Sequence, residues 1–361
     1  MKIFHCGQCD QLVFYENTAC IRCGHLLAYL PDQQDMGTLE PDGGDLWHSL
    51  PSPSGTVEKS YRLCKNYAEQ NVCNWAVAAD DPNPFCLSCR LTRTIPDLSR
   101  AENRAAWARM EVFKRRLVRS LISLGLPLVS KVEDPRKGLI FDFLADPETP
   151  GAPPVLTGHD DGVIVINVAE ADDAEREKRR KEMHEPYRTV LGHFRHEVGH
   201  YYWDVLIKDS EWIEGYRQLF GDEREDYDQA LKRHYAEGAP PDWSSRFVSA
   251  YASTHSWEDW AETWAHYLHI EDTLETAVEC GLSLTPKRRG EPAMKPDISL
   301  DGERPTSFDQ IIERWFPLTY VLNNLNRGMG LPDAYPFVLS SPAIEKLRFV
   351  HEVCSRSAVP A

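Results

Sequence analysis

Two histidines and a glutamate have a spacing that can activate water for hydrolysis. His196, Glu197 and His200 follow the order HExxH. On a helix, residues four apart lie one above the other, so both imidazoles can point a nitrogen at one tetrahedral zinc ion. Glu197 cannot easily reach the same ion, but it can act as general base toward a zinc-bound water whose pKa falls from about 16 toward ~7. The alternative is a pair of surface histidines on an amphipathic helix.

The residues around this motif predict the helix that it needs. Pro186 suits a first helical turn, and apolar residues recur at helical spacing. His193 lies one turn before His196 and is a rival ligand. Three ligands from one short helical stripe cannot easily surround a tetrahedral ion, so we expect His193 to support a ligand or the fold instead. The apolar positions are Val190, Leu191, Phe194 and Val198.

The third zinc ligand is not the one used by proteases with the longer pattern HExxHxxGxxH. The glycine and histidine of that pattern would fall at 203 and 206, where this chain has Trp203 and Leu206. This difference excludes that class. A glutamate from a second helix is the remaining possibility.

A second helix is predicted to begin near Ser256. Ser256 and Asp259 form an N-terminal capping signal, which places Glu258 in the first turn. Glu258 and Glu262 fall on one face, apart from an apolar face that is rich in tryptophan. One of the two carboxylates could bind zinc, and the other could hold a ligand imidazole by its distal N–H.

These residues resemble the gluzincin metallopeptidases, and in particular the lethal-factor type of toxin protease. That type has a tyrosine, six residues, the ligand glutamate, three residues and another glutamate. Tyr251, Glu258 and Glu262 occupy those places here. The resemblance implies that Glu258 is the third zinc ligand, that Tyr251 hydrogen-bonds the developing oxyanion, and that Glu262 orients a zinc-bound histidine. A core tyrosine and two solvated carboxylates are the alternative.

Four cysteines near the N-terminus predict an independent zinc site. Two Cys-x2-Cys pairs separated by ten residues have the spacing of a zinc ribbon with two knuckles. The alternative is two disulfides. The chain starts without an apolar signal segment of useful length, so we expect a cytoplasmic protein in a reducing compartment, where disulfides are rare. The predicted ligands are Cys6, Cys9, Cys20 and Cys23.

Four further cysteines form a second quartet. Only one pair has the Cys-x2-Cys spacing, so four free thiols are the alternative. We expect structural zinc because the surrounding region has little hydrophobic core of its own. Cys280 and Cys354 stand alone and are expected to be ordinary buried thiols. The members of the second quartet are Cys64, Cys73, Cys86 and Cys89.

The combination of these features resembles a bacterial family of zinc-binding metallopeptidases with a zinc-ribbon head. The resemblance covers nearly the whole chain and includes the segments 192–204 and 333–339. It implies zinc-dependent peptide hydrolysis, and it indicates no substrate.

The expected fold class is α+β, with a zincin-like, mainly helical metallopeptidase domain that contains a small mixed sheet. A β zinc ribbon and a second small Cys-rich zinc module precede this domain. A Pro/Gly/Asp-rich run after the ribbon is typical of a linker. Ser99 and Glu102 predict the cap of the helix with which the metallopeptidase domain begins. The predicted boundaries are 1–30 for the ribbon, 31–54 for the linker, 55–98 for the second module and 99–361 for the metallopeptidase domain.

Two strands are predicted before the HExxH helix, at residues 138–144 and 162–167. The second could form the sheet edge on which an extended substrate pairs, or it could lie inside the sheet. The charged run at residues 170–185 is most simply a solvated helix or loop.

Composition restricts the partners. The net charge of −16 and the pI of about 5.3 argue against a surface that follows nucleic-acid phosphates. No run of 18 apolar residues is present, which argues against a membrane span. We expect a peptidase that cleaves peptide or isopeptide bonds of a protein or peptide substrate, with one catalytic and two structural zinc ions. The alternatives are a catalytically silent zinc-binding adaptor and a nucleic-acid-binding ribbon protein. The sequence does not determine the oligomeric state.

Overall fold

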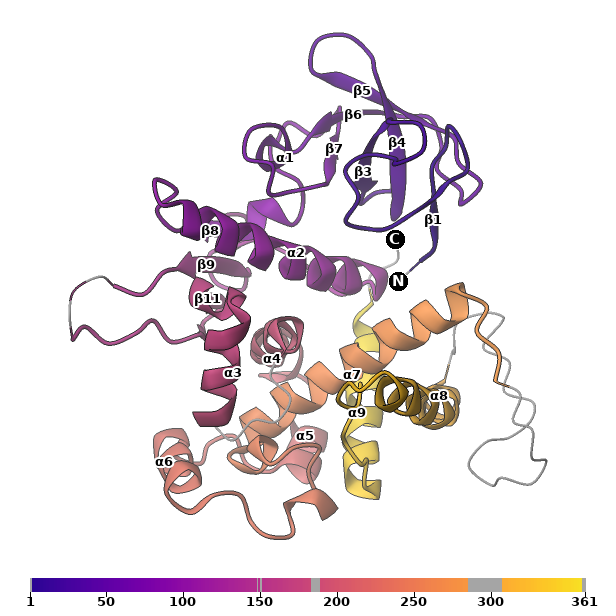
Figure 1. The fold of residues 1–361 in the computed structure, drawn as a ribbon. Helices are drawn as coiled ribbons and strands as arrows, with labels where there is room; N and C mark the ends of the chain where they lie inside the picture. Colours follow the sequence, from indigo (N-terminus) through magenta and orange to yellow (C-terminus); the bar gives the residue numbers. More distant parts are fainter. Residues whose placement is uncertain (1, 148, 150, 183–188, 285–306, 359–361) are drawn as a thin grey trace. The chain divides into compact units, whose positions relative to one another are not determined.

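The computed structural model describes residues 2–147, 149, 151–182, 189–284 and 307–358. Apart from a few terminal residues, they form two compact units, Ile3–Lys208 and Asp209–Arg356. The first unit combines three sheets with helices, and the described part of the second is helical (Figure 1). The chain is therefore a mixed α+β protein with an N-terminal cysteine-rich part and a mainly helical C-terminal part. In the described ranges, no helix is both long and apolar enough to cross a membrane.

A five-stranded antiparallel sheet forms the centre of the cysteine-rich part. Its core contains Leu27, Tyr29, Tyr61 and Trp75, all fully buried. A short antiparallel pair, β1 (Phe4–His5) with β2 (Leu12–Val13), precedes the sheet and carries the first knuckle. In sheet order the five strands are β3 (Leu26–Leu30), β4 (Asp35–Pro41), β5 (Leu46–Leu50), β6 (Ser60–Leu63) and β7 (Ala76–Ala78).

The predicted linker at residues 31–54 is wrong, because β4 and β5 lie there. The glycines of that run form a turn instead of a flexible connection. Gly43 and Gly44 have positive φ values of 84° and 63°, a conformation that glycine adopts without steric cost, and they join β4 to β5.

The second cysteine quartet does not belong to a separate module either. β6 and β7 lie within the predicted module 55–98, yet they complete the sheet that begins with β3. Tyr29 N donates to Asn74 O at 2.8 Å, and Tyr67 Oη donates to Leu27 O at 2.9 Å. The ribbon and the second quartet therefore share one core.

A four-stranded mixed sheet follows, in the order β10, β11, β9, β8. β11 is antiparallel to β10 and parallel to β9, so it lies inside the sheet, which is the second of the two alternatives that the sequence leaves open. β8 pairs with β9 although it precedes residue 99, so this sheet begins before the predicted domain boundary. The strands are β8 (Thr92–Thr94), β9 (Ile140–Leu144), β10 (Gly158–Asp160) and β11 (Val163–Asn167).

The long helix α2 (Ala101–Ser123) packs against α4 (Val190–Tyr202) (Figure 1). It also packs against η2 (Val168–Ala171). The predicted cap at Ser99 is wrong. Arg100 is the N-cap residue, and Ser99 N donates to Asp97 Oδ1 at 2.9 Å because the aspartate forms its own turn. The other helices of this unit are α1 (Lys65–Ala68), η1 (Cys89–Leu91), α3 (Asp173–Glu182) and the π-helical turn η3 (Trp203–Ile207).

In the second unit, aromatic side chains surround α7. Trp260 and Trp264 are fully buried, and the rings of Phe220 and Phe349 contact Trp260. Cys354 is buried as expected, whereas Cys280, just after α7, is exposed. The helices are α5 (Ile213–Phe220), α6 (Tyr227–Glu237), η4 (Trp243–Ser245), η5 (Tyr251–Ser253), α7 (Ser256–Glu279), α8 (Phe308–Gly328) and α9 (Ser341–Ser357).

The cap of α7 differs from the prediction by one residue. His255 is the N-cap, and its Nδ1 accepts from Trp257 N at 3.1 Å, so Ser256 is the first helical residue. An imidazole nitrogen accepts a backbone hydrogen bond as a side-chain oxygen does, which the capping pattern does not anticipate. Glu258 still lies in the first turn, as predicted.

Candidate metal centres and catalytic site

The HExxH residues lie on the helix that the sequence predicts. Thr189 is the N-cap of α4, where its side chain accepts from Gly192 N at 2.9 Å, and the described helix starts at Val190. Pro186, the predicted first turn, lies outside the described residues.

Two of the three imidazoles on α4, those of His196 and His200, are buried and lie close together. Nε2 of His196 and Nε2 of His200 are 3.2 Å apart. Zinc–nitrogen bonds of 2.0–2.1 Å in a tetrahedral site separate two ligand nitrogens by about 3.3 Å. The observed pair therefore fits two ligand positions of one zinc ion.

Glu197 is held by a histidine that the sequence analysis places beside the ligands. His193 Nε2 lies 3.0 Å from Glu197 Oε1, and His193 Nδ1 lies 2.8 Å from Glu170 Oε2. Because ionised carboxylates only accept, an imidazolium at His193 donates to both. Burial alone would raise the pKa of Glu197, but the hydrogen bond and charge of His193, with His196 and His200 nearby, lower it. Glu197 is thus kept as the carboxylate, which is the form a general base needs.

Glu170 is a site residue that the sequence analysis missed. It lies in η2, is buried, and accepts from Thr157 Oγ1 at 2.7 Å. The sequence places it at the start of the charged run 170–185, whose other described members lie in or beside α3. Only its position directly after an apolar strand distinguishes it from the solvated charges that follow.

His159 on β10 was also missed. Its ring stacks on that of His200 with centroids 6.1 Å apart, and its Nε2 accepts from Gly162 N at 2.9 Å. Burial, with the charge of His200, lowers the pKa of His159 to about 4. His159 is therefore a neutral neighbour of His200, and nothing in its spacing from the HExxH motif indicates this contact.

Glu258, Glu262 and Tyr251 lie in the second unit. Glu258 is buried, and Tyr227 Oη donates to its Oε1 at 2.6 Å. Ser249 Oγ donates to Glu262 Oε2 at 2.6 Å. Tyr251 lies in η5 with its ring against that of His234. The predictions that Glu258 completes the zinc site, and that Glu262 and Tyr251 act beside it, stay predictions.

Tyr227 is a third residue that the sequence analysis missed. It is the first residue of α6, and its ring also contacts those of His255 and Trp257. Tyr227 and Glu258 are 31 positions apart in the chain. A motif search limited to the second helix cannot find it.

The first cysteine quartet converges as predicted. Sγ atoms of Cys6 and Cys23 are 3.6 Å apart, as are those of Cys9 and Cys20. Zinc–sulfur bonds of about 2.3 Å separate the sulfurs of a tetrahedral site by about 3.8 Å. None of these four cysteines forms a disulfide. The arrangement fits a zinc ion held by four thiolates.

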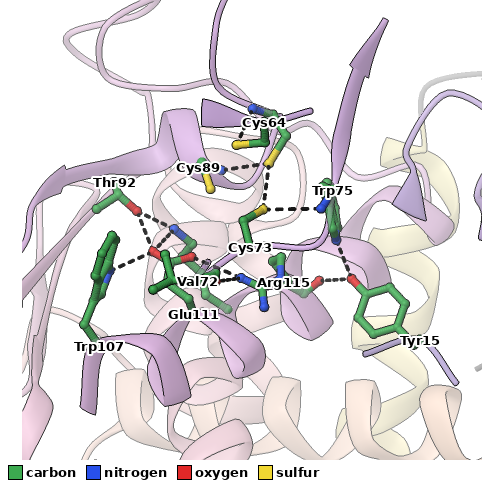
Figure 2. Close-up of polar contacts among 12 residues, drawn as sticks. Tyr15, Cys64, Val72, Cys73, Trp75, Cys89, Thr92, Trp107, Glu111 and Arg115 are labelled. Atoms are coloured by element: carbon green, nitrogen blue, oxygen red, sulfur yellow. Dashed lines mark hydrogen bonds and ion pairs between the residues drawn. The ribbon is translucent and has the colours of Figure 1, made fainter. Parts of the chain in front are cut away.

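The second quartet also converges, and all four of its side chains are buried. Cys73 Sγ and Cys86 Sγ are 3.8 Å apart. Backbone N–H groups of Trp75, Cys86 and Cys89 each point at a quartet sulfur at 3.4 Å (Figure 2). Such donors favour the thiolate form, which is the form that binds metal. Four buried free thiols gain nothing from this geometry, so the quartet fits zinc.

Two cysteine quartets and a histidine pair with zinc-like ligand spacing indicate a zinc-binding protein. The chain belongs to the family described as "Putative zinc-binding metallo-peptidase", whose model matches residues 103–353. Residues 3–100 match a zinc-ribbon domain, in agreement with the core that both quartets share. The resemblance to a family of zinc-binding metallopeptidases with a zinc-ribbon head is therefore confirmed, and zinc binding is supported.

Relatives of this chain occur in mycobacteria. Proteins of Mycobacterium tuberculosis strain H37Rv and of Mycobacterium bovis, both named "uncharacterized protein", are each 42% identical over 359 residues. Each match covers 99% of this chain and 96% of the relative. No solved structure matches significantly.

Proposed function

We propose that the protein is a zinc-dependent peptidase of the gluzincin type, with a zincin-like catalytic domain. It hydrolyses peptide or isopeptide bonds of a protein or peptide. The observation that carries this proposal is the hydrogen-bonded chain Glu170–His193–Glu197, in which both carboxylates are buried, beside the paired nitrogens of His196 and His200. A structural zinc site needs no ionised carboxylate held at this position, whereas hydrolysis needs a base there.

His196, His200 and Glu258 would hold the catalytic zinc. When bound, zinc supplies a Lewis acid that polarises the scissile carbonyl and lowers the pKa of water. Glu197 Oε2 takes a proton from the attacking water while Oε1 stays bonded to His193. As the C–N bond breaks, Glu197 gives that proton to the leaving amine, so a carboxyl group and an amine result.

The residues of the second unit complete this site in our proposal. Tyr227 holds one oxygen of Glu258, which fixes the carboxylate that approaches the metal. Tyr251 donates to the developing oxyanion. Glu262 orients a ligand imidazole.

The two cysteine quartets each hold one structural zinc ion, which gives three per chain with the catalytic ion. Eight thiols that act as zinc ligands need a reducing compartment, so we propose the cytosol as the location. A catalytically silent adaptor would use the same cysteines, but it would not need Glu197 to be ionised.

The deciding experiment compares the purified protein with Glu197→Gln on a cell-derived peptide library, with new N-termini read by mass spectrometry. The native protein should produce new N-termini that disappear with a chelator and return with zinc. Glu197→Gln should keep its zinc and its fold, while cleavage falls by about 10² or more. Equal cleavage by Glu197→Gln would refute the mechanism. If the zinc-loaded native protein yields no new termini from this library, the adaptor becomes the better description.

A further inference from the structure

Helix α2 carries a group of buried charges toward the second cysteine quartet. Glu111 and Lys114 are fully buried and form an ion pair at 2.8 Å. Arg115 is also buried, but its guanidinium is 3.9 Å from Glu111. Because Lys114 already neutralises Glu111, these three residues bring an excess positive charge into the core at Arg115.

Arg115 lies against the backbone that holds Cys73. Its Nη1 donates to Val72 O at 2.6 Å, one residue before the cysteine. Its carbonyl accepts from Tyr15 Oη at 3.1 Å, and Tyr15 Oη accepts from Trp75 Nε1 at 2.9 Å. Figure 2 shows this ring of contacts around Cys73.

The positive charge of Arg115 requires a compensating negative charge nearby. A buried cation that no anion fully compensates costs several kcal/mol, and the Arg115 guanidinium lies on the carbonyl of Val72, directly before the buried Cys73. Four neutral thiols would not compensate it. Four thiolates around one zinc ion carry a net double negative charge, which does.

We propose that Arg115 is the counter-cation of a zinc tetrathiolate at Cys64, Cys73, Cys86 and Cys89, and that this metal centre locks α2 in the position that supports the HExxH helix. Arg115 stabilises the thiolates, and the thiolates stabilise Arg115. Metal binding at the second quartet is thereby coupled to the helix on which the catalytic site depends. The second half of this inference rests on the proposed catalytic function, whereas the first half does not.

The first route from this centre to α4 passes through β8 and β9. Thr92, directly after the turn that contains Cys89, donates to Glu111 Oε1 at 3.2 Å. Nζ of Lys114 lies 5.4 Å from the ring centre of Phe143, and the Phe143 and Phe194 rings are 6.3 Å apart. Phe194 precedes His196 by two residues on α4.

A second route passes through η2. α2 packs on η2, which contains Glu170. Glu170 bonds His193, and His193 bonds Glu197. A shift of α2 would therefore move the group that orients the proposed base.

Cobalt titration of the full chain tests the role of Arg115, because thiolate coordination gives cobalt a charge-transfer absorption. Cys9→Ser with Cys20→Ser removes two ligands of the first quartet, so the absorption then reports cobalt bound at the second quartet. In that background Arg115→Met should weaken cobalt binding by about 10–100-fold. Arg104→Met, an exposed position on the same helix, should leave binding unchanged. Native affinity in Arg115→Met would overturn the proposal.

A variant that keeps the charge covers the case in which Arg115→Met does not fold. Arg115→Lys should bind cobalt within a few-fold of the native chain, since it retains a cation with a shorter reach to Val72 O. If Arg115→Lys loses the metal as completely as removal of the cysteines does, charge is not the reason for Arg115, and the proposal fails.

Hydrogen exchange tests whether the metal centre at the second quartet stabilises α2 and, through it, α4. Cys73→Ser with Cys86→Ser should empty the second quartet, speed exchange of amides in α2 and α4, and weaken zinc binding at His196 and His200 by at least 10-fold. Cys9→Ser with Cys20→Ser, the matched control, should leave α4 protected. Unchanged protection of α4 after loss of the second metal would overturn the coupling. If the native chain binds no zinc at His196 and His200, the proposed function fails, while the cobalt result for Arg115 stands independently.

Discussion

His193 Nε2 lies 3.0 Å from Glu197 Oε1, one helical turn further along α4. The spacing of four residues brings the two side chains together on the helix surface. The opposite ring nitrogen is held by Glu170 from η2, at 2.8 Å. The orientation of the proposed general base therefore depends on a second element of the fold as well as on its own helix.

Removing His193 should move the pH dependence of catalysis. His193 lowers the pKa of Glu197, so Glu197 stays ionised at a pH where an ordinary buried glutamate would be protonated. In His193→Ala the hydrogen bond to Glu197 is lost, so it no longer opposes the effect of burial, and the pKa of Glu197 rises. The acidic limb of kcat/KM should shift to higher pH, and the rate should fall by about 10-fold or more from loss of one charged hydrogen bond. A pH profile that superimposes on the native one would show that His193 is only structural.

Metal analysis should find close to three zinc ions per chain. Cys6→Ser with Cys9→Ser removes two of four ligands, so one ion should be lost while the catalytic zinc stays. Mass spectrometry under native conditions measures this directly. A native content of one ion would refute both cysteine sites and leave the HExxH site standing.

The two glutamates of α7 should behave differently. Glu258→Ala removes a charged ligand and should strip the catalytic zinc. Glu262→Ala removes an orienting partner and should weaken zinc affinity by roughly 10–100-fold. Zinc titrations rank the two variants. If Glu262→Ala strips the zinc and Glu258→Ala does not, the ligand lies one helical turn further along α7. The role of Tyr251, which was inferred from its spacing to Glu258, would then have no support.

The two tyrosines should separate binding from chemistry. Tyr227 donates to Glu258, so Tyr227→Phe should weaken zinc affinity by roughly 10–100-fold. Tyr251→Phe should leave zinc affinity unchanged and lower kcat by about 10²-fold or more, as expected for one lost oxyanion donor. Zinc titration and kinetics at saturating zinc make the comparison. A kcat loss confined to Tyr227→Phe would exchange the two roles.

The sequence predicts those parts of the structure in which local spacing determines geometry. Cys-x2-Cys turns and an i, i+4 histidine pair carry their geometry within a few residues, and Cys6, Cys9, His196 and His200 are placed as expected. Strands at 138–144 and 162–167 follow from apolar runs and are confirmed as β9 and β11. The α7 cap was misplaced by one residue because His255 uses an imidazole in place of a hydroxyl.

The remaining site residues depend on tertiary contacts. Glu170 resembles the solvated charges that follow it until η2 turns it toward His193. Tyr227 reaches Glu258 only because α6 folds back toward the start of α7. The strands β4 and β5 lie in a Pro- and Gly-rich run, where composition indicates turns but does not show whether strands connect them.

The contacts of α2 with the cysteine-rich part determine where this chain can be cut. The two family matches divide near residue 100, which would suggest that the peptidase part can be produced alone. A chain that begins at residue 103 would lack β8, and Glu111, Lys114 and Arg115 of α2 would lose their hydrogen-bond partners Thr92 and Val72. Such a fragment should be insoluble or unfolded. We therefore expect the part matched as a zinc ribbon to fold together with the part matched by the metallo-peptidase family, so that deleting it would not reveal what the ribbon recognises.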